Sequence, residues 1–374
     1  ASEAASLAGH LRLGKLIYLY DSNHISLSAA TGITFTEDVG ERFEAYGWHV
    51  QRVEDGNDLT TLEKSLETAR KESDRPSLII VRTHIGYGSP HKQDSFEAHG
   101  SPLGTEEVKD TKENLGWPKE AEFLVPDRAA DHFLKAVRRG SDLETQWNAR
   151  VEEYADKYPE LYKEWRRFIN GRLPEGWEGE IPVFGPDHKP IATRSAGKEV
   201  INAIAGKVGN LAGGSADLDP STKTALKGKG SFQPPGSGDS TLPGSPGGEW
   251  FYGGSNIAFG VREHAMGGIL NGIAAHGGLI PFGATFLIFS DYMRPAMRLA
   301  ALSELQVIYV LTHDSVALGE DGPTHQPIEH LASFRAMPNM VLFRPADANE
   351  VAEAWKAAMA RREGPTMLVM SRQN

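Results

Sequence analysis

Short apolar runs that end at polar turn residues restrict the fold of this chain more than any other feature. Residues 16–20 (LIYLY), 78–81 (LIIV) and 306–311 (QVIYVL) are three such runs. A short apolar run bounded by turn residues is typical of a strand buried on both faces. The stretches at 41–47 and 58–71 have helical character instead. Alternating strands and helices predict an α/β fold built on a parallel sheet.

The middle of the chain, from about 118 to 178, is highly charged and helical, with few strand signals. Its aromatic residues argue against disorder; they include Trp147, Tyr154, Tyr158, Tyr162 and Trp165. We therefore expect a helical connector that is folded against two α/β units. Strands are expected again at 340–343 and 367–370, and residues 227–249, dense in Gly, Pro and Ser, predict a surface loop.

Composition excludes several classes of protein. The 374 residues include 39 Lys and Arg against 50 Asp and Glu, a formal net charge of −11, whereas a protein that binds mainly nucleic acid needs a basic face. The absence of cysteine excludes disulfides, thiolate catalysis and Cys-ligated metals, and it fits a cytoplasmic protein. The longest apolar stretch, 267–292, is interrupted by Asn271, His276 and paired glycines, so no membrane span is expected.

Polar residues directly follow four of the expected strands: Asn23, His84, His313 and Arg344. Ligands of open parallel sheets bind at the carboxyl ends of the strands. This placement predicts where a site would lie, but not its chemistry.

The segment 21–26 (DSNHIS) is a candidate metal site. The amide oxygen of Asn23 and the backbone oxygen of Ile25 are hard ligands of the kind that Mg²⁺ prefers, and Mg²⁺ often shares its coordination shell with phosphates. The alternative is an ordinary turn made of turn-forming residues.

The segment 213–221 (GGSADLDPS) is rich in small residues that would let the backbone approach a ligand closely. The alternative is a tight turn without a ligand.

Glu263 follows an apolar segment and precedes a glycine-rich helical stretch. We expect this carboxyl group to be partly buried, with a raised pKa suited to proton transfer. The alternative is a favourable acidic residue at a helix N-terminus.

Phe286, Phe289 and Tyr292 are spaced i, i+3, i+6, which would place them on one helical face. Such a stripe is usually part of the core, but it can also form an aromatic wall for a flat heterocycle.

Residues 313–326 (HDSVALGEDGPTHQ) gather two histidines and several carboxylates among glycines after a strand. Loops on a rigid sheet often carry function, and these groups could hold the hydroxyls and phosphate of a sugar. A zinc site and a plain surface loop are the alternatives. No dinucleotide fingerprint, Walker loop or G-x-S-x-G elbow is present.

Together these segments resemble the transketolase family, the thiamine-diphosphate enzymes of the pentose phosphate pathway. The resemblance rests on EAASLAGH, DSNHIS, IGYGSP, GGSADLDPS, FGVREHAMG, TFLIFSDYMR, THDSVALGEDGPTHQP, FRPADANE and SRQN, which occur in the family's order over nearly the whole chain. It implies a parallel-sheet thiamine-diphosphate-binding fold. The expected parts are the C-terminal half of a diphosphate-binding domain (1–125), a helical linker (126–188) and a complete pyrimidine-binding domain (189–374).

The resemblance also implies an activity: transfer of a two-carbon ketol unit from xylulose 5-phosphate to ribose 5-phosphate through a thiamine diphosphate carbanion. The implied cofactors are thiamine diphosphate and Mg²⁺ or Ca²⁺. The implied partners are sugar phosphates and a second identical subunit, with the cofactor at the subunit interface; neither nucleic acid nor a membrane is expected.

Individual residues correspond to the family's site residues. Asn23 and the backbone oxygen of Ile25 correspond to metal ligands, and Glu263 to the glutamate that hydrogen-bonds the aminopyrimidine ring. The residues that correspond to further cofactor contacts are Phe286, Phe289, Tyr292, Asp217, Ile85 and His99. Those that correspond to substrate contacts are Arg194, Ser221, His313, Asp321, His325, Arg344 and His99. The implied catalytic residues are Glu263, His99 and His313.

The sequence also departs from the family pattern. A Gly-Asp-Gly metal motif and histidines that the family has upstream of Asn23 are absent, as is the family's third domain. These absences lead us to expect a fragment or a partial sequence. One alternative is therefore a catalytically silent fragment that acts only in dimerisation or complementation. Another is dihydroxyacetone synthase, which uses formaldehyde as the acceptor; deoxyxylulose-phosphate synthase and pyruvate dehydrogenase fit less well.

Overall fold

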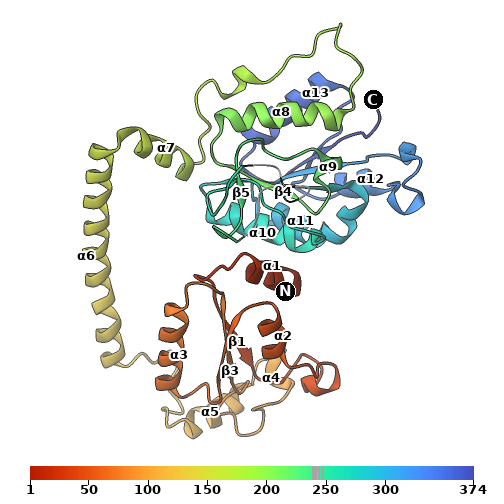
Figure 1. The fold of residues 1–374 in the computed structure, drawn as a ribbon. Helices are drawn as coiled ribbons and strands as arrows, with labels where there is room; N and C mark the ends of the chain where they lie inside the picture. The colour runs from red at the N-terminus through yellow and green to blue at the C-terminus, as the bar shows by residue number, and fades with distance from the viewer. Residues whose placement is uncertain (238–241, 243–244, 246–247) are drawn as a thin grey trace. The chain divides into compact units, whose positions relative to one another are not determined.

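A computed structural model describes residues 1–237, 242, 245 and 248–374. The chain divides into two compact units (Figure 1), one made of Ala4–Glu152 with Ser2, the other of Glu153–Asn374 with Ala1 and Glu3. Each unit has its own parallel sheet. The expected α/β class with parallel strands is therefore confirmed.

The N-terminal unit is built on a three-stranded sheet with the order β1-β3-β2. The apolar run at 78–81 lies in the central strand β3, which is buried along almost its whole length. In chain order the elements are α1 (Ser2–His10), β1 (Ile17–Ser22), η1 (Thr31–Ile33), α2 (Val39–Ala45), β2 (His49–Val53), α3 (Leu59–Lys71), β3 (Ser77–Arg82), α4 (Glu97–Gly100) and α5 (Thr105–Asn114).

Local chemistry explains where the helices of this unit begin. The side chain of Asp38 accepts the backbone N–H of Glu41 at the start of α2, and Asp58 accepts those of Thr60 and Thr61 at the start of α3. These caps satisfy backbone donors that have no partner within the helix.

One prediction for this sheet is wrong. Strand β1 exists, but it is not buried on both faces, since Tyr18 and Leu19 are 51% and 56% exposed. Apolar composition indicates a strand, whereas burial depends on its neighbours, and β1 is an edge strand of this sheet.

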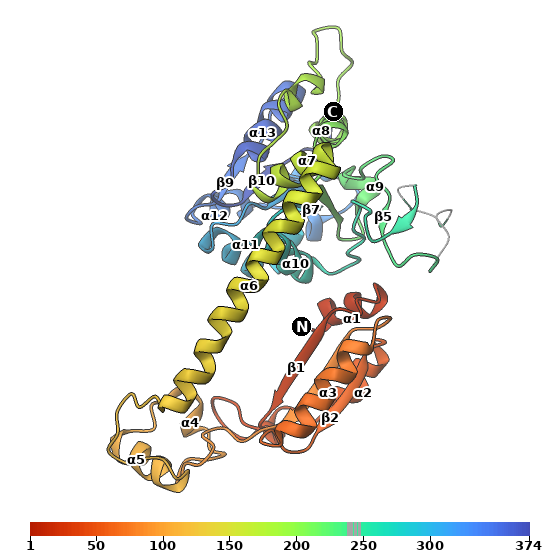
Figure 2. The ribbon, with the colours of Figure 1, turned by 90° about the vertical axis from the view of Figure 1, so that its left-hand side faces the viewer.

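The connector is helical, as expected. It contains α6 (Asp127–Lys157), which Figure 2 shows as one uninterrupted helix, and α7 (Pro159–Ile169). Helix α6 buries none of its residues, and Trp147 is 56% exposed.

The C-terminal unit is built on a five-stranded parallel sheet with the order β4-β7-β8-β10-β9. Its strands are β4 (Leu211–Ser215), β7 (Ile280–Phe286), β8 (Ile308–Thr312), β9 (Val341–Phe343) and β10 (Thr366–Val369). Its main helices are α8 (Thr193–Lys207), α10 (Glu263–His276), α11 (Ser290–Leu302) and α13 (Ala348–Ala360). The shorter elements are η2 (Trp177–Glu180), α9 (Asp219–Thr222), β5 (Ser231–Phe232), β6 (Trp250–Phe251), η3 (Leu287–Phe289), η4 (Val316–Leu318), η5 (Pro323–His325) and α12 (His330–Arg335).

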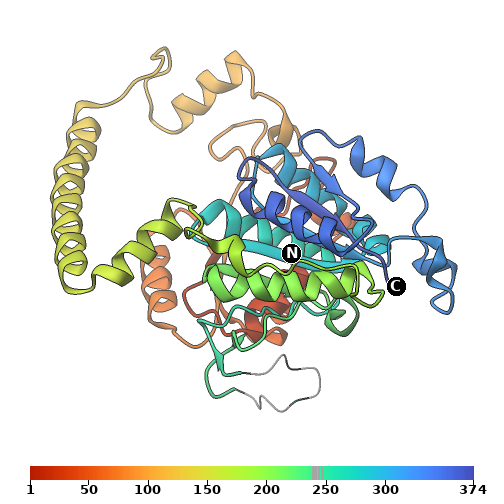
Figure 3. The same ribbon diagram turned by 90° about the horizontal axis from the view of Figure 1, so that it is seen from above.

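Helices cover both faces of this sheet. Figures 1 and 3 show α8 and α13 side by side on one face, whereas α10 and α11 pack against each other on the other face. The core beneath α8 and α13 is apolar and includes Val200, Ile204, Phe282 and Trp355. Burial of both faces explains why the strands of this unit read as continuous apolar runs.

The segment 213–221 is not a single tight turn, although residues 216 and 217 form bends within it. Residues 211–215 form the buried strand β4, and Asp219–Thr222 form α9. A Cβ on Gly213 would lie 1.9 Å from the backbone oxygen of Phe282, and one on Gly214 would lie 2.0 Å from that of Ile257. Gly213 and Gly214 therefore permit close approach between backbone segments of this unit.

The predicted loop at 227–249 is confirmed only in part. Residues 231–232 form strand β5, which pairs in parallel with β6. Residues 238–241, 243–244 and 246–247 of this stretch lie outside the described residues, so the prediction stands untested there. No helix among the described residues combines the length and the apolar composition that a membrane span requires.

Candidate functional site

The carboxyl ends of the strands carry the residues that the sequence singled out. Asn23 follows β1, His84 follows the end of β3 by two residues, His313 follows β8 and Arg344 follows β9. All four placements agree with the sequence prediction. The C-terminal unit adds Ser221, Phe286, Phe289, Asp321 and His325 at the same edge of its sheet, after β4, β7 and β8.

Four rings lie together where β7 and β8 end. The rings of Phe286 and His313 stack with centroids 3.7 Å apart, and Phe286 stacks on Phe289 at 5.8 Å. The ring of His325 lies edge-on to both phenylalanines, at 6.2 and 5.3 Å. Neighbouring parallel strands explain the first pair, because Phe286 pairs with Thr312 in the sheet register.

The expectation that Phe286, Phe289 and Tyr292 share one helical face is wrong. Phe286 ends β7, Phe289 ends the 3₁₀ turn η3 and Tyr292 belongs to α11. Residues i and i+3 eclipse in a 3₁₀ turn, which brings Phe286 and Phe289 together. Tyr292 lies apart from that pair, 53% exposed, with its ring 5.7 Å from that of His264.

Glu263 is the first residue of α10 and is 7% exposed. Burial raises the pKa of its carboxyl group, because the charged form loses its hydration. The expectations of burial and of a raised pKa are both confirmed. The alternative is also partly right, since Glu263 does begin a helix.

The ends of α8 and β10 are joined although they are far apart in the sequence. The backbone N–H of Ser371 donates to Thr193 Oγ1 at 2.7 Å, and the N–H of Arg194 donates to the backbone oxygen of Ser371 at 3.3 Å. The N-cap residue Ala192 offers no side-chain acceptor, but Ser371 Oγ accepts the N–H of Thr193 at 3.3 Å. The residues after β10 therefore occupy the first N–H groups of α8, and they bring Ser371 and Arg372 close to Arg194.

The guanidinium of Arg194 is held by Ser221, whose backbone oxygen accepts Nη1 at 2.9 Å. Its Nε is buried and has no hydrogen-bond partner within the described part of the chain. Burial lowers the pKa of Arg194, and the charge of Arg372 lowers it further. A buried cationic donor without a partner is a suitable ligand for a phosphate oxygen.

The sequence analysis missed Arg372. This residue follows β10, which lies next to β8 and its His313, whereas Arg344 follows the edge strand β9. Arg344 is already neutralised, because its Nε and Nη2 both lie 2.8 Å from Asp314 Oδ2. Arg372 donates to the backbone oxygen of Leu318 and pairs with Glu320. Arg344 was a candidate because it follows a predicted strand. The same criterion also selects Arg372, since residues 367–370 were a predicted strand.

His313 is the most buried histidine of this edge, at 2% exposure, and its φ of 59° places it in the left-handed region. Its Nδ1 lies 2.9 Å from Thr312 Oγ1. Oδ2 of the nearby Asp321 is buried and lacks a hydrogen-bond partner in the described residues. Burial excludes the plain surface-loop interpretation for His313. The zinc alternative has no support either, because the described residues that could share an ion do not include His313 or His325.

We expect the His313 ring to stay neutral from pH 8 to pH 5. Burial, and then the charge of Arg194, lower its pKa from 6.5 to about 4. Because the unfolded chain binds this proton more readily, the ring makes folding less favourable as the pH falls from 6.5 towards 4. An NMR titration of labelled histidine rings, assigned with His313→Asn, measures this. A midpoint near 6.5 for His313 would contradict the burial argument.

The N-terminal unit presents Asn23 in a tight turn. The side-chain oxygen of Asn23 accepts the N–H of Ile25 at 2.9 Å, and His24 between them has a φ of 63°. This is the turn that the alternative interpretation expected. The metal hypothesis names the side-chain oxygen of Asn23 and the backbone oxygen of Ile25, and such oxygens suit Mg²⁺ or Ca²⁺. Two ligands fit such an ion but do not complete its coordination shell.

The remaining candidate residues are more exposed. His99 lies on α4 with an exposed side chain, and Ile85 is half-buried, with its backbone oxygen accepting the N–H of Asp94 at 3.0 Å. Asp217 is exposed and has a φ of 62°, between β4 and α9.

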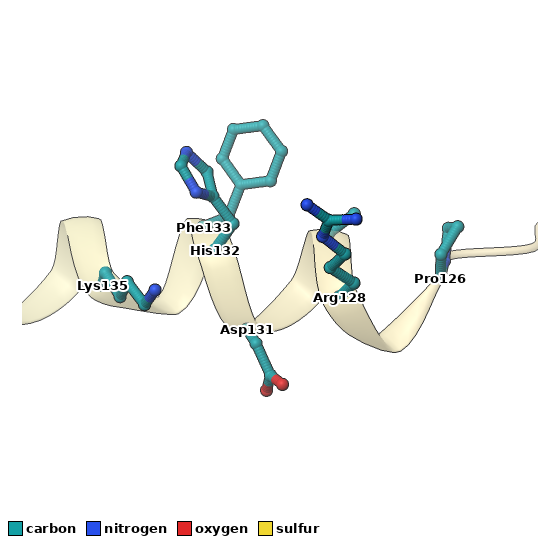
Figure 4. Close-up of a pocket in the computed structure, with 7 residues that line it drawn as sticks. Pro126, Arg128, Asp131, His132, Phe133 and Lys135 are labelled. Carbon is teal, nitrogen blue, oxygen red and sulfur yellow. The ribbon is translucent and has the colours of Figure 1, made fainter.

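A depression of about 820 Å³ at the start of α6 is not a candidate site. Figure 4 shows its side chains projecting from a single helix, with Asp131 directed away from Arg128 and His132. Ligand sites need polar groups that converge from several elements, and this surface has none.

Two family models together match most of the chain. The thiamine diphosphate binding domain of transketolase matches residues 1–174, and the transketolase pyrimidine binding domain matches 189–374. A transketolase from Geobacillus stearothermophilus is 54% identical, with 100% of this chain and 54% of the relative covered. A chloroplastic transketolase from Craterostigma plantagineum is 50% identical, with 100% of this chain and 69% of the relative covered.

Solved structures agree with these matches. A crystal structure of transketolase from Pichia stipitis, in complex with sedoheptulose-7-phosphate, has a TM-score of 0.93 and 43% identity, and covers 100% of this chain and 54% of that one. Transketolase from Leishmania mexicana has a TM-score of 0.90 at 40% identity, with 53% of that chain covered. The chain spans about half the length of the Geobacillus stearothermophilus relative and of these structures. By sequence and by structure, this chain belongs to the transketolase family.

Proposed function

We propose that the protein transfers a two-carbon ketol unit from a ketose phosphate, xylulose 5-phosphate, to an aldose phosphate, ribose 5-phosphate. The observation that carries this proposal is the grouping of Arg194, Arg372 and Ser221 at the start of α8. His313 and Asp321 lie next to that cationic group. The membership in the transketolase family supports the same activity.

The cationic group would bind the phosphate of the sugar. The guanidinium groups of Arg194 and Arg372 offer charge-assisted hydrogen bonds to phosphate oxygens, and the buried Nε of Arg194 has no partner among the described residues. The overall charge of −11 does not oppose this, because local charge governs binding. Arg344 would not contribute directly, since the buried Asp314 holds both its Nε and its Nη2, whereas the partner of Arg372, Glu320, is exposed.

The sugar hydroxyls would form hydrogen bonds with His313, Asp321 and His325. A neutral His313 offers one donor and one acceptor, and its ring is fixed by Phe286 and Thr312. The unpartnered oxygen of Asp321 can accept a hydroxyl proton. These residues would orient the sugar relative to the reacting carbon.

The described residues fit thiamine diphosphate in three respects. Glu263 is a buried carboxyl group for the aminopyrimidine ring, Phe286 and Phe289 present stacked rings, and Asn23 and Ile25 present oxygens for Mg²⁺ or Ca²⁺. When bound, the cofactor supplies a stabilised carbanion at its thiazolium carbon. Glu263 would hold a proton at the pyrimidine ring, and His99, Ile85 and Asp217 are proposed as further contacts.

Assembly and location are part of the proposal. We infer a homodimer with the cofactor at the subunit interface, and sedimentation of the full-length protein tests it. A cytoplasmic location is proposed from the lack of cysteine; related enzymes include chloroplastic ones, so cell fractionation tests this point.

The activity test compares acceptors. The protein, expressed at the length its gene encodes and supplied with thiamine diphosphate and Mg²⁺, is expected to convert xylulose 5-phosphate with ribose 5-phosphate. Formaldehyde, the acceptor of the dihydroxyacetone synthase alternative, is expected to support at most a small fraction of that rate. A preference for formaldehyde would overturn the assignment, as would activity with neither acceptor. The silent alternative concerns the 374 residues by themselves, so they are assayed beside the full-length protein, and equal turnover by both would exclude it.

A further inference from the structure

We propose that Asp291, Glu329 and His330 form a binding site for a divalent transition-metal ion, separate from the residues assigned above. One carboxylate oxygen from each acidic residue and one ring nitrogen of His330 all lie within 4.8 Å of one another. Asp291 belongs to the first turn of α11, and Glu329 and His330 lie at the start of α12.

His330 is the residue that points to a ligand. Its ring is 1% exposed, and neither ring nitrogen has a hydrogen-bond partner among the described residues. Nε2 nevertheless lies 3.0 Å from Asp291 Oδ2. A buried polar group without a partner is unfavourable, and an ion between the nitrogen and the carboxylate would satisfy it.

The distance suits coordination. Two ligand atoms that each lie about 2.1 Å from an ion are about 3.0 Å apart at the right angle of an octahedral site and about 3.4 Å apart at a tetrahedral angle. Asp291 Oδ2 and His330 Nε2 are 3.0 Å apart. One imidazole nitrogen with two carboxylates is a ligand set for Zn²⁺ or Mn²⁺ rather than for Mg²⁺.

The charged side chains around the proposed site favour a divalent cation. The nearby Arg294 lies 3.6 Å from Asp291 Oδ1, the oxygen that does not face His330. The guanidinium of Arg294 is also held by Ser333 Oγ, at 2.8 Å, and by the ring of Phe334, at 4.1 Å. Two carboxylates therefore face the proposed ion with one arginine behind them, a net negative surrounding.

A second cluster of possible ligands makes the contrast clear. In the cluster of His91, Glu107 and Asp110, Glu107 already accepts hydrogen bonds from Ser89 and from the N–H and ring of His91. His91 is exposed there. That cluster is satisfied by its own bonds, whereas His330 is not.

The ion would join two segments of the candidate site. Asp291 lies two residues after Phe289, and Glu329 lies four residues after His325. The ring centroids of Phe289 and His325 are 5.3 Å apart. A shared ion would hold both segments and so stabilise the ring cluster. This consequence rests on the proposed function, whereas binding of the ion does not.

Equilibrium dialysis with Zn²⁺ tests the proposal on the full-length protein, after chelator treatment and in excess Mg²⁺. The wild type is expected to bind one Zn²⁺ per chain. The Zn²⁺ affinity of Glu329→Gln and of Asp291→Asn is expected to be at least about 10-fold lower. These two side chains are exposed, so folding should survive. Glu199→Gln, an exposed acidic residue elsewhere, and His91→Asn in the other cluster are expected to retain wild-type affinity.

Equal Zn²⁺ affinity in the wild type, Glu329→Gln and Asp291→Asn would overturn the proposal, as would the absence of Zn²⁺ binding. Metal stoichiometry does not depend on ketol transfer. A protein that binds Zn²⁺ without transferring a ketol unit, or the reverse, would therefore separate this proposal from the proposed function.

Discussion

Glutamine in place of Glu263 is expected to reduce two-carbon transfer by about 100- to 10,000-fold, the range that a positioned general acid or base contributes. The carboxyl group is 7% exposed and burial raises its pKa, which favours the protonated form that a proton donor needs. Glutamine keeps the shape and the hydrogen-bonding capacity but cannot exchange that proton. The measurements are kcat at saturating substrates and the Kd of thiamine diphosphate.

A matched control keeps this test specific. Glu353→Gln removes an exposed carboxylate from α13 and is expected to leave kcat unchanged. The unfolding temperature of Glu263→Gln should not fall below that of the wild type, because the substitution removes a buried ionisable group. A Glu263→Gln enzyme within threefold of wild-type kcat would show that this carboxyl group does not take part in proton exchange.

Leucine in place of Arg372 is expected to raise KM for ribose 5-phosphate by about 10- to 100-fold, the worth of a hydrogen bond to a charged group. Arg372 lies in the same charged group as Arg194 and His313, after the strand next to β8. KM for an acceptor aldehyde without a phosphate should change little. Steady-state kinetics with both acceptors measure the difference.

The matched variant is Arg344→Leu. Arg344 pairs with the buried Asp314, so its loss should lower thermal stability through an unpaired carboxylate and leave KM for ribose 5-phosphate near the wild-type value. The reverse pattern, with KM raised by Arg344→Leu and not by Arg372→Leu, would return Arg344 to the phosphate site that the sequence resemblance gave it.

The difference between Arg344 and Arg372 shows which features of the site a single sequence predicts. Apolar runs predicted strands, and the residues after them were correctly placed at strand ends, His313 and Arg344 among them. Which strand ends meet depends on the order of strands in the sheet, and a single sequence does not contain that order. The order β8-β10-β9 places Arg372 between the other two.

Burial was harder to predict than element type. The apolar residues of β1 and the aromatic residues of α6 suggested packed elements, yet Tyr18 and Trp147 are exposed. Helical spacing likewise failed for Phe286 and Phe289, because a strand end and a 3₁₀ turn lie between 286 and 289. The buried Glu263 was predicted correctly, since an acidic residue between two apolar segments has little access to water.

The measurement that tests the central proposal most directly follows the two-carbon unit itself. Full-length protein with thiamine diphosphate and Mg²⁺ is incubated with ribose 5-phosphate and xylulose 5-phosphate labelled with ¹³C at its first two carbons. Carbon NMR is expected to find both labels, still bonded to each other, in the first two carbons of sedoheptulose 7-phosphate, with unlabelled glyceraldehyde 3-phosphate as the second product. Label that stays in xylulose 5-phosphate, or that enters a product separately, would contradict the assignment.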